Sequence, residues 1–387
     1  MITVTEKSKC SGCYACYSSC PRSCIRIVSD PEGFWYPQVD ADNCVDCGIC
    51  EQKCPILQKS APSSSEPPLV VAAINTNDSI RLNSSSGGIF TLLAEDIIAQ
   101  GGVVFGAAYS EDYLRVEHIC VDNKEELERI RGSKYVQSRI SDTYKEVKQY
   151  LDSGRKVLFT GTPCQIGGLY SFLGANHDHL YTQDIICHGV PSPDIWTKYL
   201  QYHRQRAGSE IKKVLFRNKR SGWKSYSMQI VFINDSEYIN DFHADPYMRA
   251  FLSNICLRPS CYNCSFKSIN RQADITLADF WGVQNELPQF DDDRGTSLIM
   301  VHSGKGKEML SRISHSIKMQ EVCADVVKQY NSAAVHSVAC NKNRSKFFKE
   351  VTCDNFDKVT NLYCKKSLWK RAKRKIKRLL QPKTLKK

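Results

Sequence analysis

Two stretches near the start of the chain decide its first domain: "CSGCYACYSSCP" (residues 10–21) and "CVDCGICEQKCP" (residues 44–55). Each has the spacing C-x₂-C-x₂-C-x₃-C-P, the run with which bacterial ferredoxins bind two [4Fe–4S] clusters. Zinc is the alternative, but zinc sites usually pair two short C-x₂₋₄-C units and lack this triple followed by x₃-C-P. The spacing therefore predicts a ferredoxin-like two-cluster module over residues 1–56.

The eight cysteines of this module are predicted to form two ligand sets. Three closely spaced thiolates hold one cluster, and the fourth cysteine of each motif crosses to the other cluster. Two adjacent clusters transfer single electrons, so this module is predicted to be the point where electrons enter or leave. The predicted sets are Cys10, Cys13, Cys16 and Cys54 for one cluster, and Cys20, Cys44, Cys47 and Cys50 for the other.

The rest of the composition is that of a globular protein with unusually many cysteines. The 387 residues include 19 cysteines, with 42% hydrophobic and 24% charged residues. The start has no basic segment followed by an apolar run, so we expect a cytoplasmic protein. Cysteines at fixed spacings in a reducing compartment indicate metal ligands and not disulfides.

The pattern after the module changes twice, and it predicts a multi-domain α+β protein. A Ser- and Pro-rich linker is expected over residues 57–68. Alternating strand-like and helix-like runs predict an α/β domain over residues 69–208. Antiparallel strand patterns then predict an α+β domain over residues 209–364. Residues 365–387 form a separate basic tail.

Two predicted helix starts in the α/β domain suit an anionic ligand. "NSSSGGIF" (residues 83–90) puts serines and glycines just before a helix, and "FTGTPCQIGG" (residues 159–168) leads from a strand into a helix. Free backbone N–H groups at such ends favour phosphate. Ordinary helix capping is the alternative, because neither stretch is a G-x-G-x-x-G motif or a P-loop.

The sequence resembles the beta-subunit family of coenzyme F420 hydrogenases and dehydrogenases, in the form with an N-terminal two-cluster ferredoxin domain. The resemblance runs in order from the start of the chain to about residue 310. It rests on seven stretches: "SSGGIFTLLAEDIIAQGGVVFGAAY" (85–109), "GSKYVQS" (132–138), "FTGTPCQIGGL" (159–169), "DIICHGVPSP" (184–193), "FRNKRSGW" (216–223), "CYNCSFKSINRQADITLADFWG" (261–282) and "DDRGTSLIMVHSGKG" (292–306).

The resemblance implies an FAD in the α/β domain and a further [4Fe–4S] cluster close to it. A flavin exchanges two electrons with a substrate and single electrons with clusters, which suits fusion to a ferredoxin module. The residues implied for the flavin are Ser85, Ser86, Gly87, Gly88, Lys134, Tyr135, Gln137, Thr160, Gly161, Thr162, Pro163, Cys164 and Gln165.

A third cysteine set stands in "CLRPSCYNC" (residues 256–264), where Cys256, Cys261 and Cys264 lack a fourth partner. Cys187, at the expected carboxyl end of a strand, is the favoured fourth ligand. Cys164 is the second candidate, since a helix start lowers a thiol pKa. A structural zinc is the alternative metal.

His188 follows Cys187 directly and is the one candidate for a catalytic proton donor. The alternative is a histidine that is only hydrogen-bonded within the fold. No other residue suggests itself for catalysis from the sequence.

The basic tail accounts for the whole net charge of +12, because its twelve Lys and Arg residues leave 41 basic and 41 acidic residues in the rest. Apolar residues recur on one helical face of "KKSLWKRAKRKIKRLL" (365–380). This pattern predicts peripheral contact with an anionic membrane. A nucleic-acid partner is disfavoured, since the body is neutral, and an unstructured tail is the remaining alternative.

The function expected from these features is an oxidoreductase that passes electrons between a ferredoxin-like redox partner, [4Fe–4S] clusters and FAD to reduce or oxidise a small organic molecule. Similar proteins include F420 oxidoreductases, a chlorophyll-cycle reductase and bacterial members linked to surface-polysaccharide synthesis. The fused module and the tail favour the last group. The alternatives are a non-catalytic electron-transfer subunit and, less favoured, a zinc-stabilised nucleic-acid protein.

Overall fold

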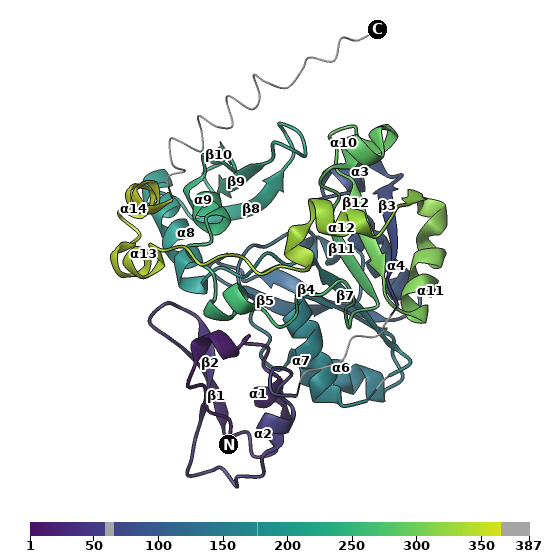
Figure 1. The fold of residues 1–387 in the computed structure, drawn as a ribbon. Helices are drawn as coiled ribbons and strands as arrows, with labels where there is room; N and C mark the ends of the chain where they lie inside the picture. Colours follow the sequence, from purple (N-terminus) through teal and green to yellow (C-terminus); the bar gives the residue numbers. More distant parts are fainter. Residues whose placement is uncertain (59–65, 176, 365–387) are drawn as a thin grey trace.

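The computed structural model describes residues 1–58, 66–175 and 177–364 (Figure 1). The N-terminal module has one antiparallel hairpin, in which Ile25 pairs with Val39, and two short helices that carry cysteines. The 3-10 turn η1 (Lys7–Lys9) precedes them. The hairpin strands are β1 (Ile25–Ser29) and β2 (Trp35–Val39), and the helices are α1 (Ala15–Ser19) and α2 (Ile49–Gln52).

One eight-stranded sheet forms the centre of the body, in the order β13-β3-β12-β11-β7-β6-β4-β5. The strands β4, β6, β7 and β11 run parallel, and β12 is antiparallel to both β11 and β3. The bounds are β3 (Leu69–Asn75), β4 (Val103–Tyr109), β5 (Val116–Val121), β6 (Val157–Gly161), β7 (Leu180–Ile185), β11 (Ile275–Asp279), β12 (Ser297–Val301) and β13 (Ile317–Glu321).

Helices cover both faces of this sheet, as the alternation of its buried residues requires. Val104 and Leu158 pack with α4 (Ile89–Ala99) and α11 (Gly304–Ile313) on one face. Their neighbours Phe105 and Phe159 pack with α6 (Thr143–Asp152) and α7 (Pro163–Leu173) on the other. The sheet is therefore a buried middle layer, and its carboxyl edge collects the loops that follow its parallel strands.

A second, smaller sheet has the order β10-β9-β8 and packs on an aromatic-rich core. Its strands are β8 (Ile211–Asn218), β9 (Ser227–Phe232) and β10 (Glu237–Asp241), and the helices around it are α8 (Pro193–Ala207), α9 (Pro246–Leu252), α13 (Arg344–Glu350) and α14 (Phe356–Tyr363). The remaining elements are α3 (Asp78–Leu82), α5 (Leu127–Ile130), α10 (Val283–Glu286), α12 (Asp325–Tyr330), η2 (Pro259–Asn263), η3 (Pro288–Phe290), η4 (Ser314–Ser316) and η5 (Ser332–Ala334).

The mixed, multi-domain α+β class expected from the sequence is confirmed, but the boundary expected at residue 208 does not separate two sheets. The strands β11 to β13 lie beyond that boundary, yet they join the large sheet. The reason is that β11 pairs in parallel with β7, while β12 and β13 pair with β3 on either side. Both predicted domains therefore contribute strands to the same eight-stranded sheet.

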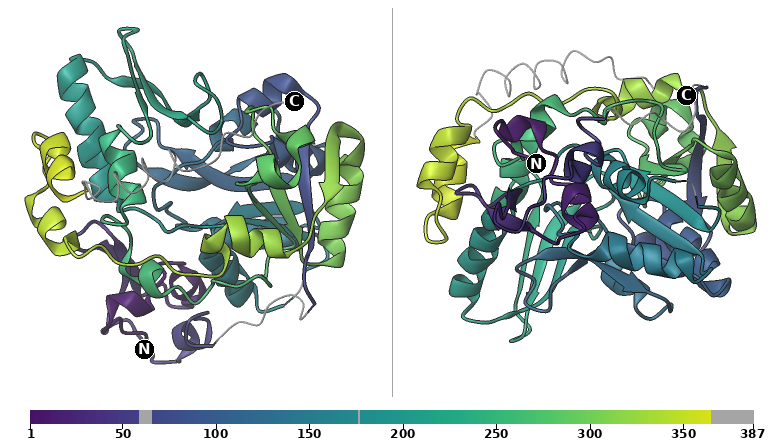
Figure 2. Two further views of the ribbon diagram at one scale, coloured as in Figure 1. Left: turned by 45° about the horizontal axis from the view of Figure 1, so that its top comes forward. Right: turned by 90° about the horizontal axis from the view of Figure 1, so that it is seen from below.

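The N-terminal module lies directly against α7 and the C-terminal helices (Figure 2). Gly168 of α7 permits the close approach, since a Cβ there would lie 2.9 Å from the Cβ of Cys13. Across the same interface, Arg344 of α13 donates two hydrogen bonds to Glu32, at 2.6 and 2.7 Å. The module is thus packed directly against the body.

Candidate redox centres

The four cysteines predicted for the first cluster lie near one another in the N-terminal module. Cys13 and Cys16 are buried beside Cys10 and Cys54. Burial raises the pKa of Cys13 to about 12, and the neighbouring thiols of Cys10 and Cys54 act in the same direction. Four neighbouring thiols, two of them buried and two partly buried, need a cationic centre to hold them as thiolates, and an iron–sulfur cluster supplies one.

The second set lines its own recess at the far end of the module, where Cys20 lies among the cysteines of the second motif. Cys47 is exposed at the surface, so this set is the outer one. Cys24, which the motif does not include, contacts Cys20 with 3.3 Å between the two sulfur atoms. The cysteines around this recess are Cys20, Cys24, Cys44, Cys47 and Cys50.

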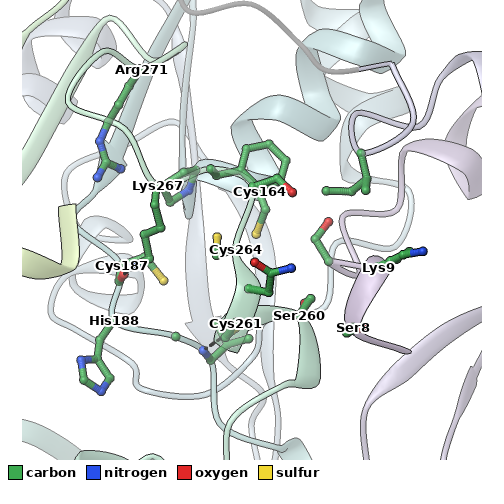
Figure 3. Close-up of a pocket in the computed structure, with 18 residues that line it drawn as sticks. Ser8, Lys9, Cys164, Cys187, His188, Ser260, Cys261, Cys264, Lys267 and Arg271 are labelled. Atoms are coloured by element: carbon green, nitrogen blue, oxygen red, sulfur yellow. Dashed lines mark hydrogen bonds between the residues drawn. The ribbon is translucent and has the colours of Figure 1, made fainter. Parts of the chain in front are cut away.

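A third group of thiols lines a cavity of about 90 Å³ between the module and the body. Its four cysteines come from three distant segments, and their side chains face one another (Figure 3). Within the described ranges, no group of three or more His, Cys, Asp or Glu side chains lies close enough together to hold a single metal ion. The cysteines are Cys164, Cys187, Cys261 and Cys264.

The structure separates Cys256 from the other cysteines of the ligand set expected from the sequence. Cys256 lies in the aromatic-rich core, fully buried near Cys364, and takes no part in the cavity. Its place follows from the chain path, because Ile255 and Cys256 continue the buried face of α9. The sequence left Cys164 and Cys187 as alternatives for one position, and the structure brings both to the cavity.

The four thiols stand in or next to the ends and turns of three elements, α7, β7 and η2. Cys164 is in the first turn of α7, with its sulfur 3.1 Å from Thr162 Oγ1. Cys187 follows β7, and Cys261 lies in η2, where its sulfur accepts a hydrogen bond from Val190 N at 3.4 Å. Cys264 ends the same turn.

Two cations that the sequence did not single out flank this cavity, Lys267 and Arg271. Lys267 donates to the carbonyl oxygens of Cys187 and Ala333. Burial raises the pKa of Cys187, and Lys267 counteracts this by stabilising the thiolate. The signal available in the sequence was "CSFKS" (264–268), where a lysine follows three residues after a cysteine.

Cys164 does not have the lowered pKa that its helix start suggested. Burial raises the pKa of its thiol well above the ordinary value, and the thiols of Cys264 and Cys187 raise it further. Desolvation and like charges outweigh the helix dipole here. A buried thiol with a raised pKa is a poor nucleophile, so Cys164 lacks the reactive character considered for it.

His188 lines the cavity but its ring points away from the sulfur atoms (Figure 3). Its Nε2 lies 2.7 Å from Asn254 Oδ1, so Nε2 carries the proton and donates it to the amide oxygen. Burial lowers the pKa of His188. This geometry holds a neutral imidazole in a fixed orientation.

The loop at Ser85–Gly88 is the better anion site of the two predicted helix starts. The N-terminus of α4 has no side-chain cap, because the cap is Gly88 at φ 83°. Ser85 Oγ accepts a hydrogen bond from Ser133 N at 2.7 Å, which joins this loop to the 132–138 segment. Lys219 donates to the carbonyl of Ser86 and to two other carbonyls, so it fixes the loop.

Lys134 stands beside this loop with an incompletely paired ammonium group. Its Nζ donates to the carbonyls of Arg131 and Gly132, at 3.1 and 3.4 Å, and lies over the ring of Tyr109. Desolvation lowers its pKa to about 7. An anionic group at this position would restore the charge of Lys134.

The second predicted helix start is occupied by its own cap. Gln165 Oε1 accepts a hydrogen bond from Thr162 N at 2.9 Å, and Pro163 supplies the first helical residue. Thr160 Oγ1 donates to Phe105 O and Gly161 ends β6, so both are parts of the sheet edge. This end of α7 presents Cys164 to the cavity and has less capacity for a phosphate.

Two other residues implied for the flavin already have protein partners. Tyr135 stacks on Phe251 with 4.9 Å between the ring centroids, and its hydroxyl accepts from Arg217. Gln137 is buried and accepts from Arg258. Within this segment, Lys134 is therefore the residue whose charge an anionic ligand would stabilise most.

Three family models match the chain in order. Residues 9–56 match a 4Fe-4S dicluster domain. Residues 70–145 match the N-terminal part, and residues 154–326 the C-terminal part, of the coenzyme F420 hydrogenase/dehydrogenase beta subunit. The first of these matches defines the N-terminal module as an iron–sulfur dicluster domain. The chain belongs to the coenzyme F420 hydrogenase/dehydrogenase beta-subunit family, and its module carries two [4Fe–4S] clusters.

Individual proteins resemble this chain only over part of its length. An uncharacterized protein of Methanocaldococcus jannaschii is 27% identical over 206 residues, which are 46% of this chain and 56% of the relative. A pyruvate synthase subunit of Methanothermobacter marburgensis is 39% identical over 51 residues, 13% of this chain and 53% of that protein. This chain thus spans about half the length of these relatives. A chain of the F420-reducing [NiFe] hydrogenase complex from Methanosarcina barkeri has a TM-score of 0.49 and 16% identity, covering 75% of this chain and 94% of that one.

No helix within residues 1–58, 66–175 and 177–364 combines the length and the apolar character needed to cross a membrane. The basic tail at residues 365–387, for which membrane contact is predicted, lies outside the described residues.

Proposed function

We propose that this protein is an iron–sulfur flavoprotein oxidoreductase that passes electrons between a ferredoxin-like partner, its [4Fe–4S] clusters and an FAD, and so reduces or oxidises a small organic molecule. The observation that carries the proposal is the convergence of four thiols from three distant segments on one cavity, next to the two-cluster module. Ser8, Lys9 and Ile56 of that module line the same cavity. A third cluster in this place would continue the electron path into the body.

The donor set of the cavity suits a [4Fe–4S] cluster, with Cys164, Cys187, Cys261 and Cys264 as its thiolates. Four cysteines complete a cubane, and Lys267 offsets part of its negative charge. These four cysteines surround a cavity and do not meet at one point, so the space between them can hold a multi-atom cluster.

The flavin is assigned to the carboxyl edge of the large sheet, where Ser85–Gly88 and Lys134 offer backbone N–H groups and a cation to a phosphate. When bound there, a flavin supplies the exchange between two-electron and one-electron chemistry. The substrate class we propose is a precursor of surface polysaccharide. Its support is the fused ferredoxin module and the composition of the tail.

Anaerobic quantitation of iron, sulfide and flavin in the purified protein tests the proposal. We expect about twelve irons, about twelve sulfides and one FAD per chain. About eight irons would remove the third cluster. Clusters without flavin would favour the second candidate, a non-catalytic electron-transfer subunit. That candidate is supported by the family itself, which is described by its beta subunits.

Replacement of Lys134 by methionine is expected to weaken flavin binding by about 10- to 100-fold, because one charge-assisted hydrogen bond contributes about 1.5–3 kcal/mol. Lys134 has a pKa of about 7 without a ligand, so it is charged below pH 7 and neutral above it. Flavin affinity should therefore fall as the pH rises from 6 to 8, and Lys134→Met should abolish this change.

Fluorescence titration of the flavin-free protein with FAD measures both effects. Lys148→Met is the matched control, since Lys148 is an exposed residue of α6 that pairs with Asp152. Equal affinities of the Lys134→Met and Lys148→Met proteins at pH 6 would contradict the assignment.

A further inference from the structure

Arg258 contacts both the N-terminal module and the body, and its side chain is 0% exposed. Its Nε donates to Cys10 O at 2.9 Å, and its Nη2 donates to Trp35 O at 3.0 Å. On the other side, Nη1 donates to Gln137 Oε1 at 3.1 Å. The guanidinium thus has neutral oxygen acceptors in the module and in the body.

The guanidinium also lies near a predicted cluster ligand and an aromatic ring. Nη2 lies 3.6 Å from the sulfur of Cys10. The ring of Tyr36 lies 4.3 Å from the guanidinium carbon. Gly12 permits this approach, since a Cβ there, at φ +69°, would lie 2.9 Å from the same carbon.

Arg258 differs from the other buried arginines in its lack of a carboxylate. Arg81 pairs with Asp292, Arg217 with Asp279 and Arg271 with Asp184. No ion pair within the described part of the chain joins Arg258 to an acidic side chain. A buried cation without an opposite charge is strongly unfavourable, so a negative group beside it is required.

We propose that Arg258 is the charge partner of the cluster held by Cys10, Cys13, Cys16 and Cys54, and that it raises the reduction potential of this cluster above that of the outer one. Reduction adds a negative charge to the cluster. A fixed cation that also donates a hydrogen bond to a ligand sulfur stabilises the reduced form more than the oxidised form.

The same residue ties this cluster to the third thiol group. The backbone oxygen of Arg258 accepts a hydrogen bond from Cys261 N at 2.9 Å. Its side chain thus sets the charge at the inner cluster while its main chain positions a cavity cysteine. A higher potential at the inner cluster draws electrons from the exposed outer cluster toward the body.

This inference rests on the two-cluster module and does not depend on a flavin or a third cluster. Its test is an anaerobic redox titration of the full-length protein, followed by electron paramagnetic resonance, with iron counted in the same samples. In Arg258→Met we expect one of the two module clusters to shift to a more negative midpoint potential while the other stays in place. Arg258→Lys, which keeps the charge, should shift the same signal less.

Glu32→Gln is the matched control, because it weakens the ion pair with Arg344 across the same interface without removing a cation from the cluster. A negative shift in Glu32→Gln equal to that in Arg258→Met would attribute the effect to looser docking and overturn the proposal. Unchanged potentials in Arg258→Met with full iron content would overturn it as well.

Loss of iron from Arg258→Met would transfer the decision to Arg258→Lys, which keeps the charge but not the planar group beside Cys10 Sγ. A negative shift of one signal in this variant supports the proposal, and no shift overturns it. The count of irons above eight reports separately on the third cluster.

Discussion

Replacement of both Cys164 and Cys261 by alanine is expected to lower the bound iron from about twelve to about eight atoms per chain, with the two module clusters intact. Two thiolates, Cys187 and Cys264, would remain in the cavity. A cubane needs four thiolate ligands, and two cannot hold it. We therefore expect the variant to lose the cluster proposed for this cavity. Iron and sulfide analysis of the anaerobically purified variant measures the loss.

Cys256→Ala is the matched control from the same nonapeptide, "CLRPSCYNC" (256–264). Cys256 is fully buried among aromatic side chains, so this change removes a small apolar group and no ligand. It should retain about twelve irons. A loss of four irons from Cys256→Ala would contradict the ligand set and restore the one expected from the sequence.

The second large effect is expected at the buried ion pair between Asp184 and Arg271, whose side chains are 1% and 2% exposed. Asp184 accepts hydrogen bonds from Arg271 Nη1, at 3.2 Å, and from Thr276 Oγ1. Asp184→Ala would leave the guanidinium buried without its carboxylate. Breaking such a pair lowers the free energy of unfolding by about 3–5 kcal/mol.

Thermal unfolding followed by circular dichroism, without oxygen, checks this expectation. The double variant Asp184→Ala/Arg271→Met should recover much of the loss, because an apolar pair of similar volume replaces the ion pair. An unfolding midpoint of Asp184→Ala equal to that of the unaltered protein would contradict the prediction. The pair also lies next to the cavity that Arg271 lines, so the destabilised variant should lose iron on heating before the double variant does.

Patterns within a single element were sufficient to predict the alternating strands and helices after residue 69 and the two helix starts, where α4 begins at Ile89 and α7 at Pro163. These features depend on neighbours in the chain: β-branched runs, helical spacing and a proline at a helix start. The ferredoxin motifs are equally local, which is why the two-cluster module could be predicted from their spacing. The crossed roles of Cys20 and Cys54 stay a prediction.

The features that the sequence did not predict depend on neighbours in space. Gly161 at the end of β6 pairs with Asp184 near the end of β7, so the loops that follow these strands are adjacent. That pairing brings Cys164 and Cys187 to one cavity together, whereas the sequence treated them as alternatives. The pairing of β11 with β7 likewise could not be read from a strand pattern, since alternation does not name a partner.

Cys256 shows the converse case, in which residues close together in the sequence lie apart in space. Three cysteines within nine residues suggest a common metal, yet Pro259 begins a new 3-10 turn between Cys256 and Cys261. The chain direction changes there, and the first thiol stays with the helix core while the other two face the cavity. Spacing alone cannot show such a change of direction.

The wall that the module contributes to the thiol cavity bears on how the protein matures. Ser8, Lys9, Ser11 and Ile56 close one side of the space in which the four cysteines meet. A preassembled cluster delivered by a carrier protein needs an open path to its ligands. For the proposed third cluster, delivery would therefore precede the packing of residues 1–56 against α7, because the docked module forms one wall of the cavity.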